Sequence, residues 1–381
     1  MAFLLSVQNV EQYLNDQNFD GSINIDSDKS ELKYAKNFNL LVTLVNGDQL
    51  LVKQERHNAA GKTAGEFLTE WKVKQFTEEF PELNDLRSRL PKILHFDAEN
   101  SILVFHYFNQ YRDLMNFYVK EKQFPIEVAT NLGTAIAEIH RTTIDDSAYR
   151  EYWSTDNIVP LSSASIGYIT PEIFGAVPFD AIKFFALFQR YDSLGQAITT
   201  LMQSYSPRCL VHQDLKLNNV LLHLEWETPQ DSVVRLIDWE RAAWGDPAFD
   251  IGTIVASYLQ LWLNSLIISK EMSIDESLRL AMIPLDRLQP SISALMQAYL
   301  KAFPEILEVD SAFVNRVVQF AGLALIGQIQ AGIQYQKSFG NAGICLLQVA
   351  KSLLCRPESS MLTVFGQIEA DLLPKKSAFF A

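Results

Sequence analysis

The sequence is poor in cysteine and in clustered positive charge. Its 381 residues include only three cysteines, Cys209, Cys345 and Cys355, and no two form a C-x-x-C pair. Neither a zinc site nor a disulfide framework is therefore expected. Asp and Glu (45) outnumber Lys and Arg (32), giving a formal net charge of −13. This balance argues against nucleic acid as a partner, because phosphate binding needs clustered basic residues. An acidic surface would attract a cationic small molecule, but it also serves solubility alone.

The sequence also lacks a clear membrane or export segment. Residues 251–269 contain no charged residue, yet Gln260 and Asn264 interrupt them. Polar residues at this spacing favour a buried helix, and residues 317–335 have the same character. The start, MAFLLSVQNVEQYL, has neither a basic region nor a long apolar stretch of the secretory type. We therefore expect a cytoplasmic protein without a membrane partner and with a large helical lobe.

The first hundred residues alternate short β-like runs with one helix. Residues 39–45 and 49–54 are apolar runs joined by Asn46-Gly47-Asp48, which predicts a β-hairpin. Residues 65–80 are typical of a helix, and residues 101–107 of a strand. After Asn109 the pattern is mainly helical. The sequence thus predicts an α+β protein with a small β-rich lobe over residues 1–109 and a helical lobe over residues 110–381.

The densest group of chemically useful side chains lies in residues 210–240, LVHQDLKLNNVLLHLEWETPQDSVVRLIDWE. Two apolar runs, 220–224 and 233–237, are separated by a turn-like segment. If they pair antiparallel with 220 facing 237, Asn219 faces Asp238, and facing Cα atoms lie about 5 Å apart. An amide oxygen and a carboxylate at one point suit Mg²⁺.

Asp214 precedes Asn219 by five residues, in the polar segment that enters this hairpin. A carboxylate beside a metal-bound triphosphate can accept the proton of an attacking hydroxyl group. His212 has two interpretations, a catalytic base or a side chain that orients the loop by a hydrogen bond. The second is preferred, because Asp214 is better placed to take the proton.

These motifs resemble those of a known family. HQDLKLNN (212–219) followed by IDWE (237–240) is similar to the catalytic and metal-binding motifs of protein-kinase-like enzymes. The following GDPAFD (245–250) resembles the aminoglycoside phosphotransferase family, which includes kinases of antibiotics, choline-like amines and homoserine. The resemblance implies a two-lobed protein-kinase-like fold that uses ATP and Mg²⁺.

The resemblance also implies roles for single residues. Asp214 would be the catalytic base, Asn219 and Asp238 would hold Mg²⁺, and Lys216 would lie near the transferring phosphoryl group. Asp246 and Asp250 are expected to tie the catalytic loop to the helix at residue 251.

On the nucleotide side, Lys53 lies in an apolar strand and resembles the lysine that pairs with the α- and β-phosphates. Its partner should be a glutamate on the next helix, either Glu70, which we prefer, or Glu66, one turn away. The hinge that reads adenine should include His106 and Phe108. The phosphate-covering loop is expected near residues 33–38, although this segment contains no glycine.

The sequence therefore predicts an ATP- and Mg²⁺-dependent phosphotransferase that acts on a hydroxyl group of an aminoglycoside-, amino-alcohol- or sugar-like molecule. The alternative is a non-catalytic, ATP-binding pseudokinase. A protein kinase is disfavoured, because only seven residues separate Asp238 from Asp246 and no A-P-E follows. The run Ala60-Gly61-Lys62-Thr63 is not a Walker A motif, because Arg56 stands where its first glycine belongs.

Overall fold

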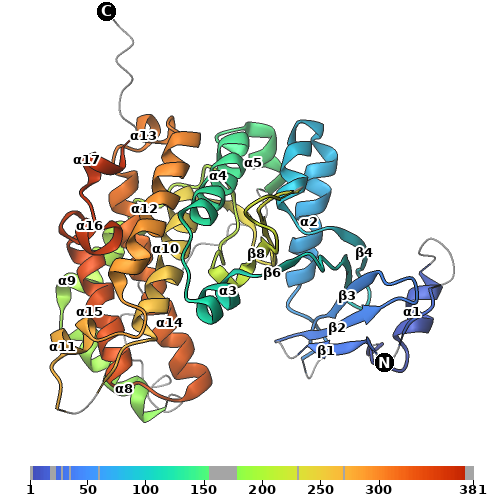
Figure 1. Cartoon of the computed structure of the whole chain (residues 1–381), viewed down its shortest axis with the longest axis horizontal. Coiled ribbons are helices and arrows are strands. Elements are labelled where there is room, and N and C mark those ends of the chain that lie inside the picture. The colour runs from blue at the N-terminus through green and yellow to red at the C-terminus, as the bar shows by residue number, and fades with distance from the viewer. Residues whose placement is uncertain are drawn as a thin grey trace, which may run out of the picture. The chain divides into compact units, whose positions relative to one another are not determined.

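The computed structural model describes most of the chain (Figure 1). The described residues are 3–17, 23–26, 29–33, 36–58, 61–153, 178–229, 231–268 and 271–373. They divide into two compact units. Unit 1 comprises residues 1–112 and 221–242, and unit 2 comprises residues 113–220 and 243–381. The division of the chain into two lobes at residue 109 stays a prediction.

Unit 1 is built on a five-stranded antiparallel sheet with the strand order β1-β2-β3-β5-β4. A second, three-stranded sheet has the order β6-β8-β9. The elements are α1 (Val10–Asp16), β1 (Glu31–Lys33), β2 (Phe38–Thr43), β3 (Gln49–Gln54), α2 (Glu66–Glu79), the 3₁₀ helix η2 (Pro81–Arg89), β4 (Ile93–Asp97), β5 (Ile102–His106), β6 (Tyr111–Asp113), β8 (Val220–His223) and β9 (Val234–Leu236).

The β2–β3 hairpin forms as the Asn46-Gly47 turn predicts, with Leu40 facing Val52. Gly47 has φ +92°, a conformation that a residue without a Cβ adopts at little cost. Because side chains alternate along a strand, the sheet buries both faces. One face packs Leu40, Val42 and Val52 against Leu14 of α1. The other packs Leu103 and Phe105 with Phe67 of α2. Lys53 alternates with Val52 along β3, so its side chain lies on the second face, with Nζ 5.1 Å from the centroid of the Phe105 ring.

The pairing of β8 with β9 differs by one residue from the predicted register. The His223 N–H donates to Val233 O at 2.9 Å, so residue 223, rather than 224, faces 233. Leu224 instead donates to Gln110 O at 2.8 Å, and the turn after β8 begins there. The register argument for opposing Asn219 and Asp238 was therefore wrong, because a one-residue slip changes every facing pair. Their joint role at a metal stays a prediction.

Unit 2 is mostly helical. Two short strands, β7 and β10, pair antiparallel beside the helices. Its elements are α3 (Leu114–Glu121), α4 (Ile126–Thr143), α5 (Ser147–Trp153), α8 (Phe179–Gln189), α9 (Asp192–Gln203), β7 (Cys209–Val211), the 3₁₀ turn η3 (Leu217–Asn219), β10 (Ala243–Gly245), α10 (Pro247–Leu263), α11 (Ile274–Arg279), α12 (Leu285–Ala302), α13 (Ile306–Val309), α14 (Phe313–Gln336), α15 (Asn341–Cys355), α16 (Pro357–Phe365) and α17 (Glu369–Leu372). The predicted α+β class, a small β-rich part and a mostly helical remainder, is confirmed.

The two apolar segments predicted as core helices correspond to α10 and α14, which pack side by side (Figure 1). Nearly every residue of α10 is buried. In the part of the chain that the structure describes, α14 is the one helix long and apolar enough to cross a membrane. Of its apolar window, 56% is buried within the structure, against α10 and α15. This burial agrees with the predicted core role of both helices.

Candidate active site

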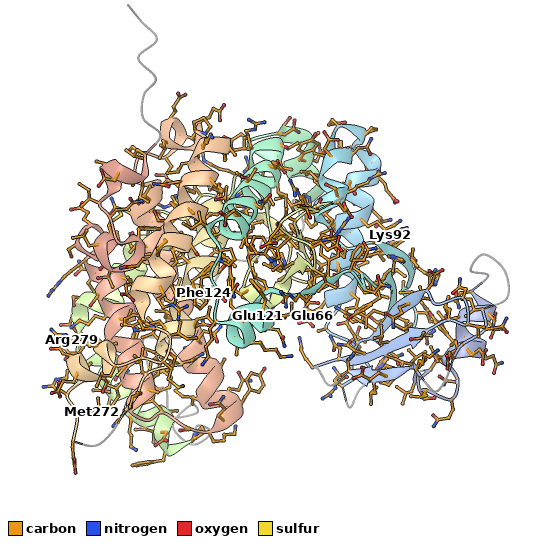
Figure 2. The ribbon with its side chains drawn as sticks, in the orientation of Figure 1. Glu66, Lys92, Glu121, Phe124, Met272 and Arg279 are labelled. Atoms are coloured by element: carbon orange, nitrogen blue, oxygen red, sulfur yellow. The ribbon has the colours of Figure 1, made fainter. Side chains whose placement is uncertain are left out.

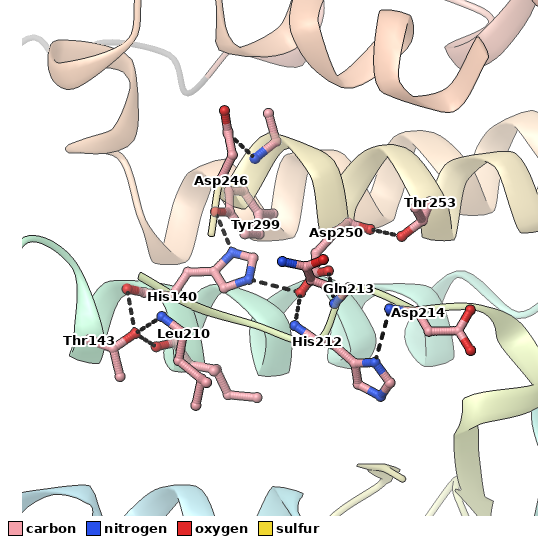
Figure 3. A network of polar contacts seen from close by, with 12 residues as sticks. His140, Thr143, Leu210, His212, Gln213, Asp214, Asp246, Asp250, Thr253 and Tyr299 are labelled. Atoms are coloured by element: carbon pink, nitrogen blue, oxygen red, sulfur yellow. Dashed lines mark hydrogen bonds and ion pairs between the residues drawn. The ribbon is translucent and has the colours of Figure 1, made fainter. Parts of the chain in front are cut away.

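The predicted catalytic loop of unit 2 is attached to α10 by one carboxylate (Figure 3). Asp250, which is 2% exposed, accepts the His212 N–H at its Oδ2 (2.6 Å) and the Gln213 N–H at its Oδ1 (2.9 Å). A carboxylate that accepts backbone N–H groups makes stronger hydrogen bonds than a neutral acceptor does. Gln213 has φ +62°, so the loop turns sharply at the point where the carboxylate holds it. The structural role predicted for Asp250 is thereby observed.

Asp250 is itself held by side chains from other helices. His140 of α4 lies with Nε2 3.4 Å from Asp250 Oδ2, and its Nδ1 lies 2.9 Å from the Tyr299 hydroxyl of α12. Burial raises the pKa of Tyr299 well above its ordinary value, so this hydroxyl stays protonated. The strand that leads into the loop is fixed too, because Leu210 donates its N–H to Thr143 Oγ1 at 3.1 Å. The loop therefore rests on a polar network inside the helical core.

The Asp214 carboxylate projects from this anchored loop and is partly exposed, at 24% for its side chain. Its Oδ2 accepts a hydrogen bond from Lys216 Nζ at 2.8 Å. Asn219 donates its Nδ2 to the Asp214 carbonyl at 2.9 Å, which turns its Oδ1 away from that carbonyl. Leu217 N bonds Ser257 Oγ of α10 at 3.0 Å. Three of the predicted site residues, Asp214, Lys216 and Asn219, are thus brought together within unit 2.

His212 orients the loop, as preferred from the sequence. The Asp214 N–H donates to His212 Nδ1 at 3.3 Å, and the imidazole is fully buried. A buried ring engaged with the backbone of the loop is a positioning group rather than a base.

Asp246 is the N-cap residue of α10. Its Oδ1 caps the helix by accepting the Ala248 N–H at 3.0 Å, and its Oδ2 accepts the Ser206 N–H at 2.8 Å. Arg316 of α14 also donates to Oδ2. Burial raises the pKa of Asp246, although Arg316 and the backbone donors oppose this shift. Asp246 thus ties Ser206 and α14 to the start of α10, whereas the predicted tie to the catalytic loop is made by Asp250.

In unit 1, Lys53 Nζ lies 2.6 Å from Asp238 Oδ1. Burial alone would lower the pKa of Lys53, but Asp238 and Glu70 together raise it well above its ordinary value. The lysine is therefore a fixed cation. Asp238 has φ +68°, an unusual backbone conformation for a residue with a side chain. Such strained residues cluster at functional sites.

The two glutamates weighed as partners of Lys53 have different environments. Both carboxylate oxygens of Glu66 accept hydrogen bonds from Lys36 Nζ, each at 2.5 Å. Glu70 is buried, at 1% exposure, and its Oε1 accepts the Trp239 N–H at 3.4 Å. Burial raises the pKa of Glu70 to about 7, while the positive charge of Lys53 opposes the shift. Glu70 is thus the acid that shares the interior with Lys53, while the direct ion pair of Lys53 is with Asp238.

The predicted hinge residues lie at the end of β5. The rings of His106 and Phe108 pack edge to face with centroids 5.5 Å apart. The His106 N–H donates to Lys92 O at 2.9 Å, and Phe108 O accepts the Tyr111 N–H at 3.1 Å. Burial and nearby Lys92 lower the pKa of His106, so the ring is neutral near pH 7. Adenine binding at these two residues stays a prediction.

Two weaker sequence signals fall near positions that the structure does not describe. Residues 34 and 35 of the predicted phosphate-covering loop lie outside the described residues, as does Ala60 of the rejected Walker run. Beside Ala60, Asn58 and Lys62 bond each other in a local turn, with Asn58 N to Lys62 O at 2.8 Å and Lys62 N to Asn58 Oδ1 at 3.0 Å. The backbone N–H groups of Asn58 and Lys62 therefore donate within this turn rather than to a phosphate.

Sequence reasoning missed His140, Tyr299 and Arg316. His140 and Tyr299 support the catalytic loop through Asp250, and Arg316 contacts Asp246 at the start of α10. His140 lies among the buried, mostly apolar residues of α4, and a polar residue at such a position was the one signal in the sequence.

Unit 1 thus holds a strand lysine paired with an aspartate, and unit 2 holds an anchored loop that presents a carboxylate. The model of the phosphotransferase enzyme family (APH) matches residues 39–267 of the chain. The chain belongs to this family, and the resemblance read from residues 212–250 is confirmed.

Individual relatives are distant. A 4-hydroxytryptamine kinase of Psilocybe cyanescens is 23% identical over 178 residues, which are 44% of this chain and 46% of that protein. The chain thus spans about half the length of this curated relative. An ADP-bound aminoglycoside phosphotransferase, APH(2'')-Ib, is 14% identical, with coverage of 91% of this chain and 98% of the other and a TM-score of 0.45. A choline/ethanolamine kinase family protein from Mesorhizobium loti is 14% identical, with coverage of 95% and 98% and a TM-score of 0.44.

Proposed function

We propose that this protein transfers the γ-phosphate of ATP to a hydroxyl group of a small molecule. The observation that carries the proposal is the anchored loop of unit 2, in which Asp250 fixes the backbone and leaves the Asp214 carboxylate partly exposed beside Lys216. The Lys53–Asp238 pair of unit 1 supports it, because it puts a permanent cation and a carboxylate on elements of the nucleotide-binding part.

The side chains fit the metal and nucleotide that the family implies. Asp238 offers a partly exposed carboxylate, and Asn219 offers an amide oxygen that does not take part in the Nδ2 hydrogen bond to Asp214 O. Oxygen donors of these two kinds suit Mg²⁺. Among the described residues, no three His, Cys, Asp or Glu side chains form a metal cluster. A two-ligand site agrees with this, because Mg²⁺ takes its other ligands from phosphate and water.

In the proposed mechanism, Asp214 accepts the proton of the acceptor hydroxyl as its oxygen attacks phosphorus. Lys216 Nζ lies 2.8 Å from the same carboxylate and would bring a positive charge near the transferring phosphoryl group. Lys53 binds phosphate oxygens, and Glu70 and Asp238 keep it charged. Asn219 and Asp238 would hold Mg²⁺, which neutralises charge on the phosphates when it is bound. His106 and Phe108 would contact adenine.

The acceptor class is an aminoglycoside, an amino alcohol or a sugar, and the chain's net charge of −13 favours a cationic member. Because one relative is named 4-hydroxytryptamine kinase, that amine belongs in the same acceptor screen. We place the enzyme in the cytoplasm. A pseudokinase has no specific support, since the base and both metal ligands are present in the sequence.

The test is the substitution Asp214→Asn. With an acceptor identified by ADP release, transfer should fall by several orders of magnitude, because the amide cannot take the proton. ATP affinity should change little. Asp192→Asn, on an exposed turn of α9, is the matched control and should keep full turnover. Undiminished turnover in Asp214→Asn would remove Asp214 from the mechanism.

A further inference from the structure

Unit 1 contains a cavity of about 500 Å³, lined in part by Glu70 and by Trp239, the residue after Asp238. Its first wall is one face of α2, with Glu70, Val73 and Thr77 spaced one turn apart. A second wall runs from the end of η2 into β4 and includes Leu90 and Leu94. The volume lies in the range of small-molecule sites, which are mostly apolar with a few polar groups. Lys53 is not among its lining residues.

The third wall joins this cavity to the nucleotide side. It consists of Phe108, Arg235 and Trp239, and Trp239 follows Asp238 directly. The Arg235 guanidinium lies over the Phe108 ring, 4.4 Å from its centroid. Lys92, labelled in Figure 2, also lines the cavity, and its carbonyl accepts the His106 N–H. The lining therefore includes two predicted nucleotide-site residues, Glu70 and Phe108, and the neighbours of two more predicted site residues, Asp238 and His106.

Two buried polar groups on the lining are incompletely satisfied. Glu70 Oε2 has no hydrogen-bond partner among the described residues, although the side chain is 1% exposed. Arg235 Nε likewise has none within the described part of the chain, and this residue is 8% exposed. Buried polar atoms are normally paired, because an unpaired one costs about 1–3 kcal/mol. One of these groups accepts a hydrogen bond and the other donates one.

The other charges of the lining are either paired with carboxylates or, as for Arg87 and Lys92, exposed to water. Lys74 Nζ pairs with Glu78 at 2.8 Å, and Arg235 pairs with Asp231 at 2.7 Å. Arg87 donates to Thr77 O at 2.8 Å. The interior therefore does not require a charged ligand. It requires an apolar body with one hydrogen-bond donor and one acceptor.

We infer that this cavity binds a small, uncharged, one- or two-ring molecule whose N–H group donates to Glu70 and whose carbonyl group accepts from Arg235. Because Glu70 also shares the interior with Lys53, occupancy should change the affinity of the nucleotide site. The cavity would thus be a regulatory site beyond the proposed phosphotransfer.

The probe is quinolin-2-one, a two-ring lactam with adjacent N–H and C=O groups. Its binding to the full chain is titrated by saturation-transfer NMR without nucleotide, so the result does not depend on the proposed activity. N-methylquinolin-2-one has the same shape but no donor, and it should bind at least about tenfold more weakly. Equal binding of the two lactams, or no binding of either at millimolar concentration, would overturn the inference. Binding of quinoline-2-carboxylate alone would also overturn it, since that result would indicate an anion site.

Two variants locate the probe. Glu70→Met keeps the length of the side chain but removes the acceptor, so the difference between the two lactams should disappear. Glu79→Met, on an exposed position of the same helix, should preserve this difference.

Leu94→Trp narrows the cavity and should weaken quinolin-2-one binding at least tenfold. Leu362→Trp, at an exposed leucine of α16, should not. Unchanged probe binding in Leu94→Trp would place the probe elsewhere.

Coupling is measured as ADP affinity with and without saturating quinolin-2-one. We expect at least a threefold change, with an equal change in lactam affinity when ADP is saturating, because coupling between two sites is reciprocal. An ADP affinity that the lactam does not alter would overturn the regulatory part. Failure of ADP to bind at all would instead count against the proposed function.

Discussion

At the residue scale, Asp250 is the clearest case of one side chain that organises a site. Its two carboxylate oxygens each accept one backbone N–H of the catalytic loop, from His212 and Gln213. The motif G-D-P-x-x-D places such an aspartate at the start of a helix, and this much is visible in the sequence. His140, which supports it, was not predictable, because its contact with Asp250 depends on how α4 packs against α10.

The substitution Asp250→Asn should loosen the loop. An amide has only one oxygen, so its NH₂ group must face one of the two backbone N–H donors. We expect a loss of about 2–3 kcal/mol in the free energy of unfolding, measured by urea titration. Turnover, measured at a temperature well below the melting temperature, should also fall. The control Asp192→Asn should keep the wild-type stability and turnover. Wild-type turnover in a destabilised Asp250→Asn protein would show that the loop does not need this anchor.

The pKa of Glu70, raised to about 7 by burial, predicts a pH-dependent stability. The folded protein holds this proton more tightly than the unfolded chain, whose ordinary pKa is 4.5. Stability should therefore fall as pH rises from about 4.5 to about 7. Glu70→Gln should remove on the order of 2 kcal/mol of the stability difference between pH 5 and pH 8, measured without nucleotide. Glu79→Gln should retain the wild-type difference, and an unchanged difference in Glu70→Gln would refute the assignment.

At the scale of elements, the helical unit depends on close approach between helices. A Cβ added to Gly133 of α4 would lie 2.2 Å from Leu295 O of α12. Backbone cannot move aside as a side chain can, so this contact requires glycine. The pairing of α4 with α12 also brings His140 to Tyr299, which links helix packing to the catalytic loop.

Gly133→Ala should therefore destabilise the protein by about 3 kcal/mol or more, because an added methyl group overpacks the interface. Gly327→Ala, inside α14, is the matched control. A Cβ there meets nothing within 4 Å, so alanine should raise the free energy of unfolding by about 0.5–1 kcal/mol. Thermal or urea unfolding measures both, and equal effects of the two substitutions would contradict the packing argument.

At the scale of the whole molecule, the proposed binding of ATP and Mg²⁺ should appear as a change in the stability of the folded chain. A ligand that binds only the folded chain stabilises it by mass action, by about 2.7 kcal/mol at a concentration of 100 times its Kd.

We therefore expect saturating ATP with Mg²⁺ to raise the melting temperature of the chain, and EDTA to remove most of that increase. Asp238→Asn should lose the Mg²⁺-dependent part, since it weakens an oxygen ligand, whereas Asp192→Asn should keep it. Differential scanning fluorimetry measures the shift. A melting temperature that ATP raises equally with and without Mg²⁺ would exclude Asp238 and Asn219 as metal ligands.

By itself, the sequence determined the family, the α+β class, the β2–β3 hairpin and the local motif around Asp214, Asn219 and Asp238. These features depend on residues close together in the chain, where spacing and turn chemistry act directly. Tertiary structure decided the register of β8 with β9, the ion pair of Lys53 with Asp238 rather than with Glu70, and the support of Asp250 by His140. Each of these is a contact between distant segments, and its geometry follows from packing that local sequence does not specify.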